Sequence, residues 1–242
     1  MPDAADYLRA IADESAVLLA AADRAGLDAP VPSCPGWSVA DLLGHIGGVQ
    51  GWAAEMSKRD PGGDYIARDP SVIPDALELP EWFASRTAAL VEALDRPSDE
   101  PAWSWIPPAT VGFWHRRQAH EAVMHRVDAE LAAGVAGPAI DAALATDGID
   151  EFLTMVQAFN PTGIGEAGTT LHFHCTDVEG EWLARLEPAG IVIEREHAKG
   201  DVAARGGASD LLLWMQGRGQ VEGLEVFGDS ALLERWRAAT AW

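Results

Sequence analysis

The sequence predicts an α+β protein in which a bundle of helices is followed by a smaller domain of strands and helices. Between residues 3 and 160, apolar residues recur at the three- and four-residue steps of amphipathic helices. After about residue 165 the pattern changes to the alternation of half-buried strands. Runs of helices followed by runs of strands indicate segregated layers, so we expect two domains, residues 1–162 and 163–242.

The first two helices have clear boundaries in the sequence. Residues 3–25 form an amphipathic pattern, and Gly26 follows as a terminator. The next stretch, LDAPVPSCPGW, contains three prolines and cannot continue the helix. Ser38 then provides an N-cap and Asp41 its capping-box partner, so we expect a second helix that runs to about Lys58.

A long loop over residues 59–78, rich in Pro, Gly and Asp, precedes the third helix. This helix should begin near Pro80 and end near Leu94. Its inward-facing residues are predicted to be Trp82, Ala89, Leu90 and Ala93.

A fourth helix is expected over residues 113–130, with Gly134 as its terminator. The aromatic and proline-rich loop that leads into it, residues 102–114, is predicted to form part of a pocket. Core packing is the commoner role of such tryptophans. One more helix, over residues 140–159, should end before Pro161.

The C-terminal part reads as a small sheet with helices. The stretch TTLHFHCTD alternates and returns after a turn as EWLARLEP, which predicts a β-hairpin. His172 and His174 share one face of its first strand and could hold a metal, although a solvent-facing polar stripe is the commoner arrangement. Further strands are expected at residues 190–196, 201–206 and 221–229, and helices at residues 211–218 and 230–242.

Composition limits the partners and the cellular location that we expect for the protein. The chain has 17 Lys and Arg against 38 Asp and Glu, a formal net charge of −21, which disfavours nucleic-acid and membrane-surface partners. No apolar run reaches the roughly 18 residues of a membrane helix, and the N-terminus lacks a signal-peptide pattern, so we expect a cytoplasmic protein. Cys34 and Cys175 lie too far apart for a metal knuckle and are expected to be reduced thiols.

Glu121 and His125 stand out in the fourth predicted helix. Four residues apart, they leave the same helix face, where both can reach one ion. Solvated surface pairs of this kind are common, so the pair alone is a weak signal. His120 is five residues from His125, and the two diverge by about 140° around the helix, which excludes the HExxH arrangement of zinc peptidases.

His45 is the third potential ligand. It lies on the apolar stripe of the second helix, where a lone histidine is more often a satisfied core residue. Gly44, Gly47 and Gly48 surround it and lower helix propensity, which suits the close approach of another element or a ligand. If the helices form a bundle, His45 can converge with Glu121 and His125 as a zinc-type site with one open position.

The stretches VPSCPGWSVADLLGHIGGVQGWA and QAHEAVMHRVDAELAAG are similar to motifs of the mycothiol-dependent maleylpyruvate isomerase family, within the wider group of DinB-like metal-binding four-helix bundles. The stretch DVAARGGASDLLLWMQGRG resembles the second domain of that family, a sterol-carrier-like α+β domain. The resemblance covers nearly the whole chain, and its more specific motifs lie in the N-terminal part.

This resemblance implies that His45, Glu121 and His125 bind a divalent metal, with zinc as the first choice. It also implies that mycothiol, a small thiol of actinobacteria, binds there as thiolate and attacks an electrophilic substrate. The reaction would be cis–trans isomerisation of the maleylpyruvate type or thiol S-transfer. A diacid substrate would need cationic partners, of which Arg205 is the first choice as a catalytic residue, ahead of Arg86 and Arg117, although arginines are more often surface residues.

Two further interpretations remain open. A non-catalytic protein could keep this fold to bind a small ligand or to confer self-resistance. The metal in the bundle could also be purely structural. Asp128, one turn after His125, could orient the His125 ring by a contact with the nitrogen that does not bind the metal. It could equally be an ordinary surface carboxylate.

Overall fold

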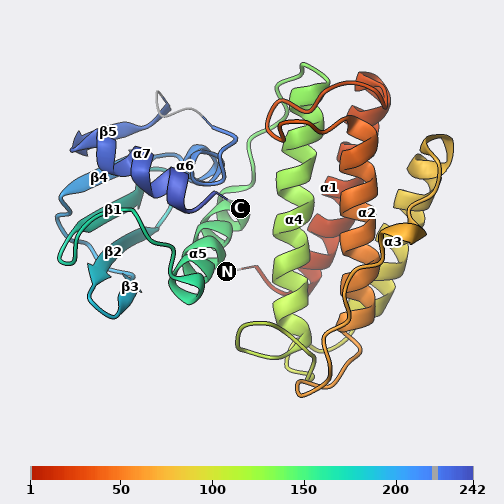
Figure 1. The fold of residues 1–242 in the computed structure, drawn as a ribbon, viewed down its shortest axis with the longest axis horizontal. Helices are drawn as coiled ribbons and strands as arrows, with labels where there is room; N and C mark the ends of the chain where they lie inside the picture. The colour runs from red at the N-terminus through yellow and green to blue at the C-terminus, as the bar shows by residue number, and fades with distance from the viewer. Residues whose placement is uncertain (1, 220–222, 242) are drawn as a thin grey trace. The chain divides into compact units, whose positions relative to one another are not determined.

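The computed structural model describes residues 2–219 and 223–241, and it divides into two compact units, Pro2–Pro138 and Ala139–Trp242 (Figure 1). This division differs from the boundary after residue 162 that the sequence predicted. Helix α5, Ala142–Phe159, packs against α6 (Ala208–Met215) and β3 (Gly190–Glu194) and therefore belongs to the second unit. Helical periodicity alone could not show which core the apolar face of α5 would join.

The first unit is a bundle of four helices. Helices α1, α2 and α4 run side by side in Figure 1, and α3 packs against α2 and α1. The loop between α2 and α3 contains two short 3-10 helices, Pro70–Val72 and Ala76–Glu78. The four helices are α1 (Ala4–Ala25), α2 (Val39–Met56), α3 (Leu79–Leu94) and α4 (Val111–Ala132).

Helix α2, which carries His45, is positioned by its N-cap and by two close-packed glycines. Ser38 and Asp41 form the predicted capping box. A Cβ atom at Gly47 would lie 2.3 Å from the ring of Trp82 on α3, so the absence of a side chain lets the two helices approach. A Cβ at Gly44 would lie 3.2 Å from Ile73 of the following loop. Both contacts fit the close approach that the sequence suggested.

The inward face of α3 differs from the predicted one at two positions. Ala89 is exposed, whereas Phe83 is buried in the core of the bundle. Leu90 and Ala93 are buried as predicted, and Trp82 is half-buried. Alanine carries little directional information in a helical pattern, so the larger Phe83 side chain determines which face turns inward.

The second unit contains a five-stranded sheet in the order β3-β2-β1-β4-β5. Strands β1 and β4 are parallel, and the other neighbouring pairs are antiparallel. Phe173 of β1 contacts Trp214 and Trp236, which places the core of this unit on that face of the sheet. The strands are β1 (Thr170–Cys175), β2 (Glu181–Glu187), β3 (Gly190–Glu194), β4 (Val202–Gly206) and β5 (Glu225–Gly228). Helix α6 (Ala208–Met215) follows β4, and helix α7 (Ser230–Ala239) follows β5.

The predicted α+β fold class is confirmed, with helices first and the sheet second. Residues 221, 222 and 242, which the sequence assigned to a strand and to the last helix, lie outside the described residues. None of the helices in the described ranges is long and apolar enough to cross a membrane.

Candidate metal centre

Three side chains from two helices of the bundle meet at one point. His45 comes from α2, and Glu121 and His125 come from α4. One potential ligand atom of each residue lies within 4.8 Å of those of the other two, and the two imidazole centroids are 5.1 Å apart. The packing of α2 against α4 thus brings together the three residues that the sequence singled out.

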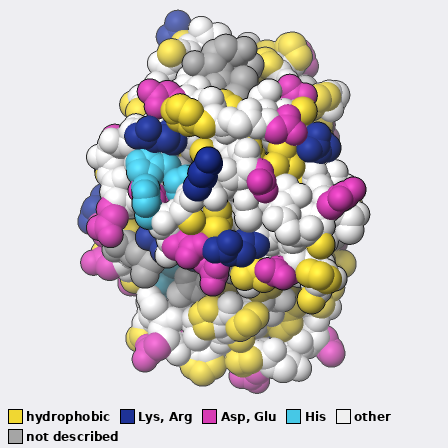
Figure 2. All heavy atoms as spheres, turned by 90° about the vertical axis from the view of Figure 1, so that its left-hand side faces the viewer, with side chains coloured by type: hydrophobic (Ala, Val, Ile, Leu, Met, Phe, Trp, Pro, Cys, Tyr) yellow, Lys and Arg dark blue, Asp and Glu magenta, His cyan; other side chains and the backbone are white. Residues whose placement is uncertain are grey.

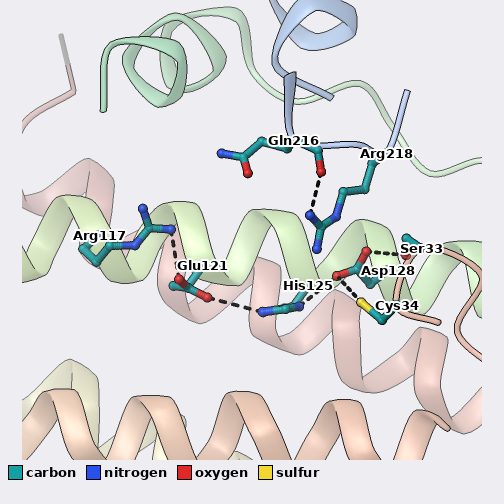
Figure 3. Close-up of polar contacts among 8 residues, drawn as sticks. All are labelled: Ser33, Cys34, Arg117, Glu121, His125, Asp128, Gln216 and Arg218. Atoms are coloured by element: carbon teal, nitrogen blue, oxygen red, sulfur yellow. Dashed lines mark hydrogen bonds and ion pairs between the residues drawn. The ribbon is translucent and has the colours of Figure 1, made fainter. Parts of the chain in front are cut away.

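The pair on α4 has the geometry expected for residues one turn apart. His125 Nε2 lies 3.3 Å from Glu121 Oε2. The other carboxylate oxygen, Oε1, lies 3.0 Å from Nη2 of Arg117, one turn earlier on the same helix. Figure 3 shows Arg117, Glu121 and His125 in a row along α4. Glu121 is therefore held between a guanidinium and an imidazole.

Asp128 holds the other side of the His125 ring. His125 Nδ1 lies 2.8 Å from Asp128 Oδ2, and Asp128 is fully buried. The loop before α2 closes over this carboxylate, since Ser33 Oγ donates a hydrogen bond of 2.5 Å to Oδ1 and Cys34 Sγ lies 3.7 Å from Oδ2 (Figure 3). With a proton on Nδ1, His125 donates a hydrogen bond to Asp128, and Nε2 is the nitrogen that faces Glu121.

The electrostatics of the cluster depend on burial and on opposite charges. Burial, and after it the positive charge of His125, lower the pKa of His45 to about 4. Burial also opposes ionisation of Glu121, but Arg117 and His125 outweigh it and hold the Glu121 pKa well below its usual range. For His125 the burial effect is overcome by hydrogen bonds to Asp128 and Glu121, which raise its pKa to about 9.

The donor set fits a divalent transition metal. Two imidazoles and one carboxylate are a typical protein set for zinc and leave one coordination position for another ligand. Bonds of about 2 Å to one ion place neighbouring ligand atoms roughly 3 to 3.5 Å apart. The 3.3 Å between His125 Nε2 and Glu121 Oε2 already lies in that range, and a ring nitrogen of His45 lies within 4.8 Å of a ligand atom of each.

One tryptophan lies beside His45, and a cluster of tryptophans lies further along the bundle. The Trp37 ring lies 4.8 Å from that of His45. Trp52 follows His45 by two turns on α2 and contacts Trp114, which precedes Glu121 by two turns on α4. Trp52 therefore lies about 10 Å along α2 from His45, and Trp114 lies about 10 Å along α4 from Glu121. The cluster that they form consists of Trp52, Trp103, Trp105 and Trp114.

The arginines selected from the sequence lie in different places. Arg117 lies beside Glu121 within the site. The Arg86 guanidinium lies over the Trp82 ring, 5.3 Å from its centroid. Arg205 lies on β4 of the second unit, with Nη1 3.6 Å from Glu225 Oε2. The role of Arg205 in substrate binding stays a prediction.

Sequence reasoning did not select some residues that act on the site. The positive charge of Arg68, in the loop between α2 and α3, contributes to the lowered pKa of His45. Ser33 binds the carboxylate that orients His125. Neither residue lies in a helical pattern, so only its position in space connects it with the site.

Two family models match the chain. Residues 8–130 match the mycothiol maleylpyruvate isomerase N-terminal domain. Residues 143–235 match the MDMPI C-terminal domain, a range that begins within α5. No curated protein matches the sequence.

Two crystal structures of a mycothiol-dependent maleylpyruvate isomerase have a similar fold. The chain is 12% identical to one of them, with 93% of each chain covered and a TM-score of 0.65. It is 11% identical to a mutant of that isomerase, with the same coverage and TM-score. At this level of identity the likeness shows a shared fold.

Proposed function

Because the chain belongs to the mycothiol-dependent maleylpyruvate isomerase family, we propose that it is a mycothiol-dependent enzyme with a divalent metal, zinc by preference, held by His45, Glu121 and His125. The proposed reaction is a cis–trans isomerisation of the maleylpyruvate type. Thiol S-transfer to another electrophile is the second candidate, since it uses the same nucleophile. The proposed site of action is the cytoplasm.

The chemistry that such a site supplies follows from the metal and the thiol. A divalent cation bound there would lower the pKa of a thiol, and the thiolate would add to a cis double bond conjugated with a carbonyl. The addition forms a C–S bond and turns the double bond into a single bond that can rotate. Elimination of the thiolate then breaks the C–S bond and restores the double bond as the trans isomer. The contribution of the protein is to hold the three ligands, to keep His125 in one tautomer through Asp128, and to leave the fourth position open.

The observation that carries this proposal is the convergence of the three ligands from two helices. Each ligand is prepared for a cation in a different way. His45 is neutral at neutral pH, Glu121 is ionised, and His125 presents Nε2 while Asp128 occupies Nδ1. A core histidine that served only packing would not need an ionised carboxylate and a second imidazole within 4.8 Å.

Groups suited to an anionic substrate lie around these ligands. Arg117 and Arg68 provide positive charge in the same unit, Arg117 next to Glu121 and Arg68 close enough to lower the pKa of His45. The tryptophans of the predicted pocket loop provide apolar surface about two helical turns away. A small carboxylate-bearing electrophile is the substrate class that this combination favours.

The test compares the wild-type protein with His45→Ala, and uses Glu55→Gln as the matched control. Glu55 is an exposed residue of α2. We expect mycothiol-dependent turnover of maleylpyruvate by the wild type, a loss of at least about 100-fold in kcat/KM for His45→Ala, and the loss of one metal equivalent per chain. Glu55→Gln should behave as the wild type.

The other outcomes separate the rival functions. Turnover of a generic electrophile, without isomerisation of maleylpyruvate, would show that the protein is a thiol S-transferase and not an isomerase. Stoichiometric binding of thiol or ligand without any turnover would show that the protein is a binding or self-resistance protein and not an enzyme. Unchanged metal content and activity in His45→Ala would overturn the site itself.

A further inference from the structure

A second group of potential metal ligands lies in the C-terminal unit. It consists of His172, His174, Glu181 and His197, whose ligand atoms all lie within 4.8 Å of one another. Figure 2 shows histidine side chains gathered on the face of the molecule that carries the sheet. None of these residues belongs to the proposed active site in the bundle.

The register of the sheet assembles three of the four residues. His172 and His174 are two positions apart on β1 and lie on the face opposite to Phe173, which packs into the core of the unit. His174 is paired directly with Glu181 across the antiparallel β1–β2 ladder. A cross-strand pair of this kind places the two side chains within direct contact, and His174 Nδ1 lies 2.5 Å from Glu181 Oε1.

The fourth residue comes from the segment after β3. His197 Nδ1 lies 2.6 Å from Glu181 Oε2, although the His197 side chain is 85% exposed. Gly200 allows this segment to pass close to β1, because a Cβ atom there would lie 3.0 Å from the backbone nitrogen of His172. The connection between β3 and β4 thus passes beside His172 and brings His197 to the hairpin.

His172 itself departs from the solvent-facing stripe that its position in the sequence suggested. It is only 6% exposed, and its Nε2 atom is buried without a hydrogen-bond partner among the described residues. Glu181 Oε2 lies 3.5 Å from this nitrogen, beyond ordinary hydrogen-bond length. A buried nitrogen without a partner is costly unless another group, such as a cation, binds it.

We propose that His172, His174, Glu181 and His197 bind one divalent transition metal, zinc by preference, as a site separate from the one in the bundle. Three imidazoles and one carboxylate complete a tetrahedral set of four protein ligands. A closed set of this kind is typical of structural sites, because no position is left for substrate. The metal ties the segment that carries His197 to the β1–β2 hairpin.

The cluster could instead be a hydrogen-bonded group in which Glu181 accepts from the imidazoles. The two arrangements differ in a measurable way. A metal site made of four side chains loses affinity when any one ligand is removed. A hydrogen-bonded cluster has no high affinity for a metal in the first place.

The experiment uses the full-length protein without an affinity tag, stripped of metal by a chelator, in the His45→Ala background that removes the bundle site. Zinc is titrated in competition with a chromophoric chelator, and cobalt is used to report tetrahedral coordination by its visible absorption. We expect one tight equivalent of zinc per chain and a rise in the melting temperature when it binds.

The decisive variant is His197→Ala, because His197 is exposed and its loss leaves the core of the sheet intact. Loss of a residue behind a ligand already costs about 10- to 100-fold in metal affinity, so the loss of His197 should weaken zinc binding at least about tenfold. Lys199→Ala, an exposed change in the same segment, is the matched control and should have no effect.

A second variant tests the site through a different ligand. His174→Gln removes a half-buried ligand and should abolish the cobalt absorption. The proposal is overturned if the His45→Ala protein binds no tight zinc, or if His197→Ala and His174→Gln bind zinc as tightly as Lys199→Ala. Either result leaves the proposed function of the bundle site untouched, because His45, Glu121 and His125 are assayed separately by turnover.

Discussion

The Nδ1 atom of His125 lies 2.8 Å from Oδ2 of Asp128, three residues further along α4. This contact joins a potential metal ligand to a fully buried carboxylate. The contact determines that Nε2 is the ring nitrogen that can bind a cation. Asp128 and Glu121 both raise the pKa of the His125 imidazole. The first two predictions depend on this relationship.

Asp128→Ala should weaken metal binding at the bundle site by about 10- to 100-fold, the usual effect of losing a partner behind a ligand. The physical reason is that the His125 ring loses both its fixed orientation and its fixed tautomer. Competition with a chromophoric chelator measures the change. Ser33→Ala is the control, since it removes only a donor to Asp128 and keeps the contact with His125. Equal effects of the two variants would contradict the proposed role of Asp128.

Metal binding at pH 7.5 should release about one proton per ion. The pKa of His125, raised to about 9, keeps the metal-free imidazole protonated at this pH, and Nε2 must lose its proton to bind metal. His45, with a pKa of about 4, and the ionised Glu121 release none. Affinity should therefore rise with pH until about pH 9 and then level off.

Calorimetry in buffers of different ionisation enthalpy measures this proton release. The His197→Ala background weakens the second site, so that the signal comes from the bundle. In Asp128→Ala the pKa of His125 should fall, and fewer protons should be released at pH 7.5. Proton release that does not depend on Asp128 would show that another group titrates.

Gly47→Ala should lower the free energy of unfolding by about 1–3 kcal/mol, the usual cost of overpacking. Its new Cβ would lie 2.3 Å from the Trp82 ring, which would force α2 and α3 apart. Gly48→Ala is the matched control, because a Cβ there meets nothing within 4 Å. It should stabilise the helix by about 0.5–1 kcal/mol. Urea unfolding of both variants measures the difference, and two equal values would argue against the close helix contact.

Arg205→Gln tests the arginine that the sequence selected for substrate binding. If Arg205 binds a carboxylate of the substrate, the loss of one charge-assisted hydrogen bond should raise KM about tenfold, and the metal content should not change. Arg86→Gln is the control, since the Arg86 guanidinium lies over Trp82. Steady-state kinetics on both variants gives the comparison. A KM for Arg205→Gln that equals that of Arg86→Gln would remove Arg205 from the site.

Much of the local structure could be predicted because it depends on neighbouring residues. The capping box of Ser38 and Asp41 and the hairpin of β1 and β2 formed where the pattern indicated. The common face of Glu121 and His125 needed only the helical repeat. The resemblance to a known family then identified His45 as the third potential ligand, which helical spacing alone could only suggest.

The sequence by itself determined the α+β class, the helices and strands within a few residues, and the three residues that meet in the bundle. Only the tertiary structure decided that α5 joins the sheet, that Phe83 rather than Ala89 faces inward, and that Asp128 lies behind His125. It also brought His197 to His172 and His174 across the sheet. The physical reason is that helix and strand periodicity arises from local backbone geometry, whereas these contacts depend on how distant surfaces pack together.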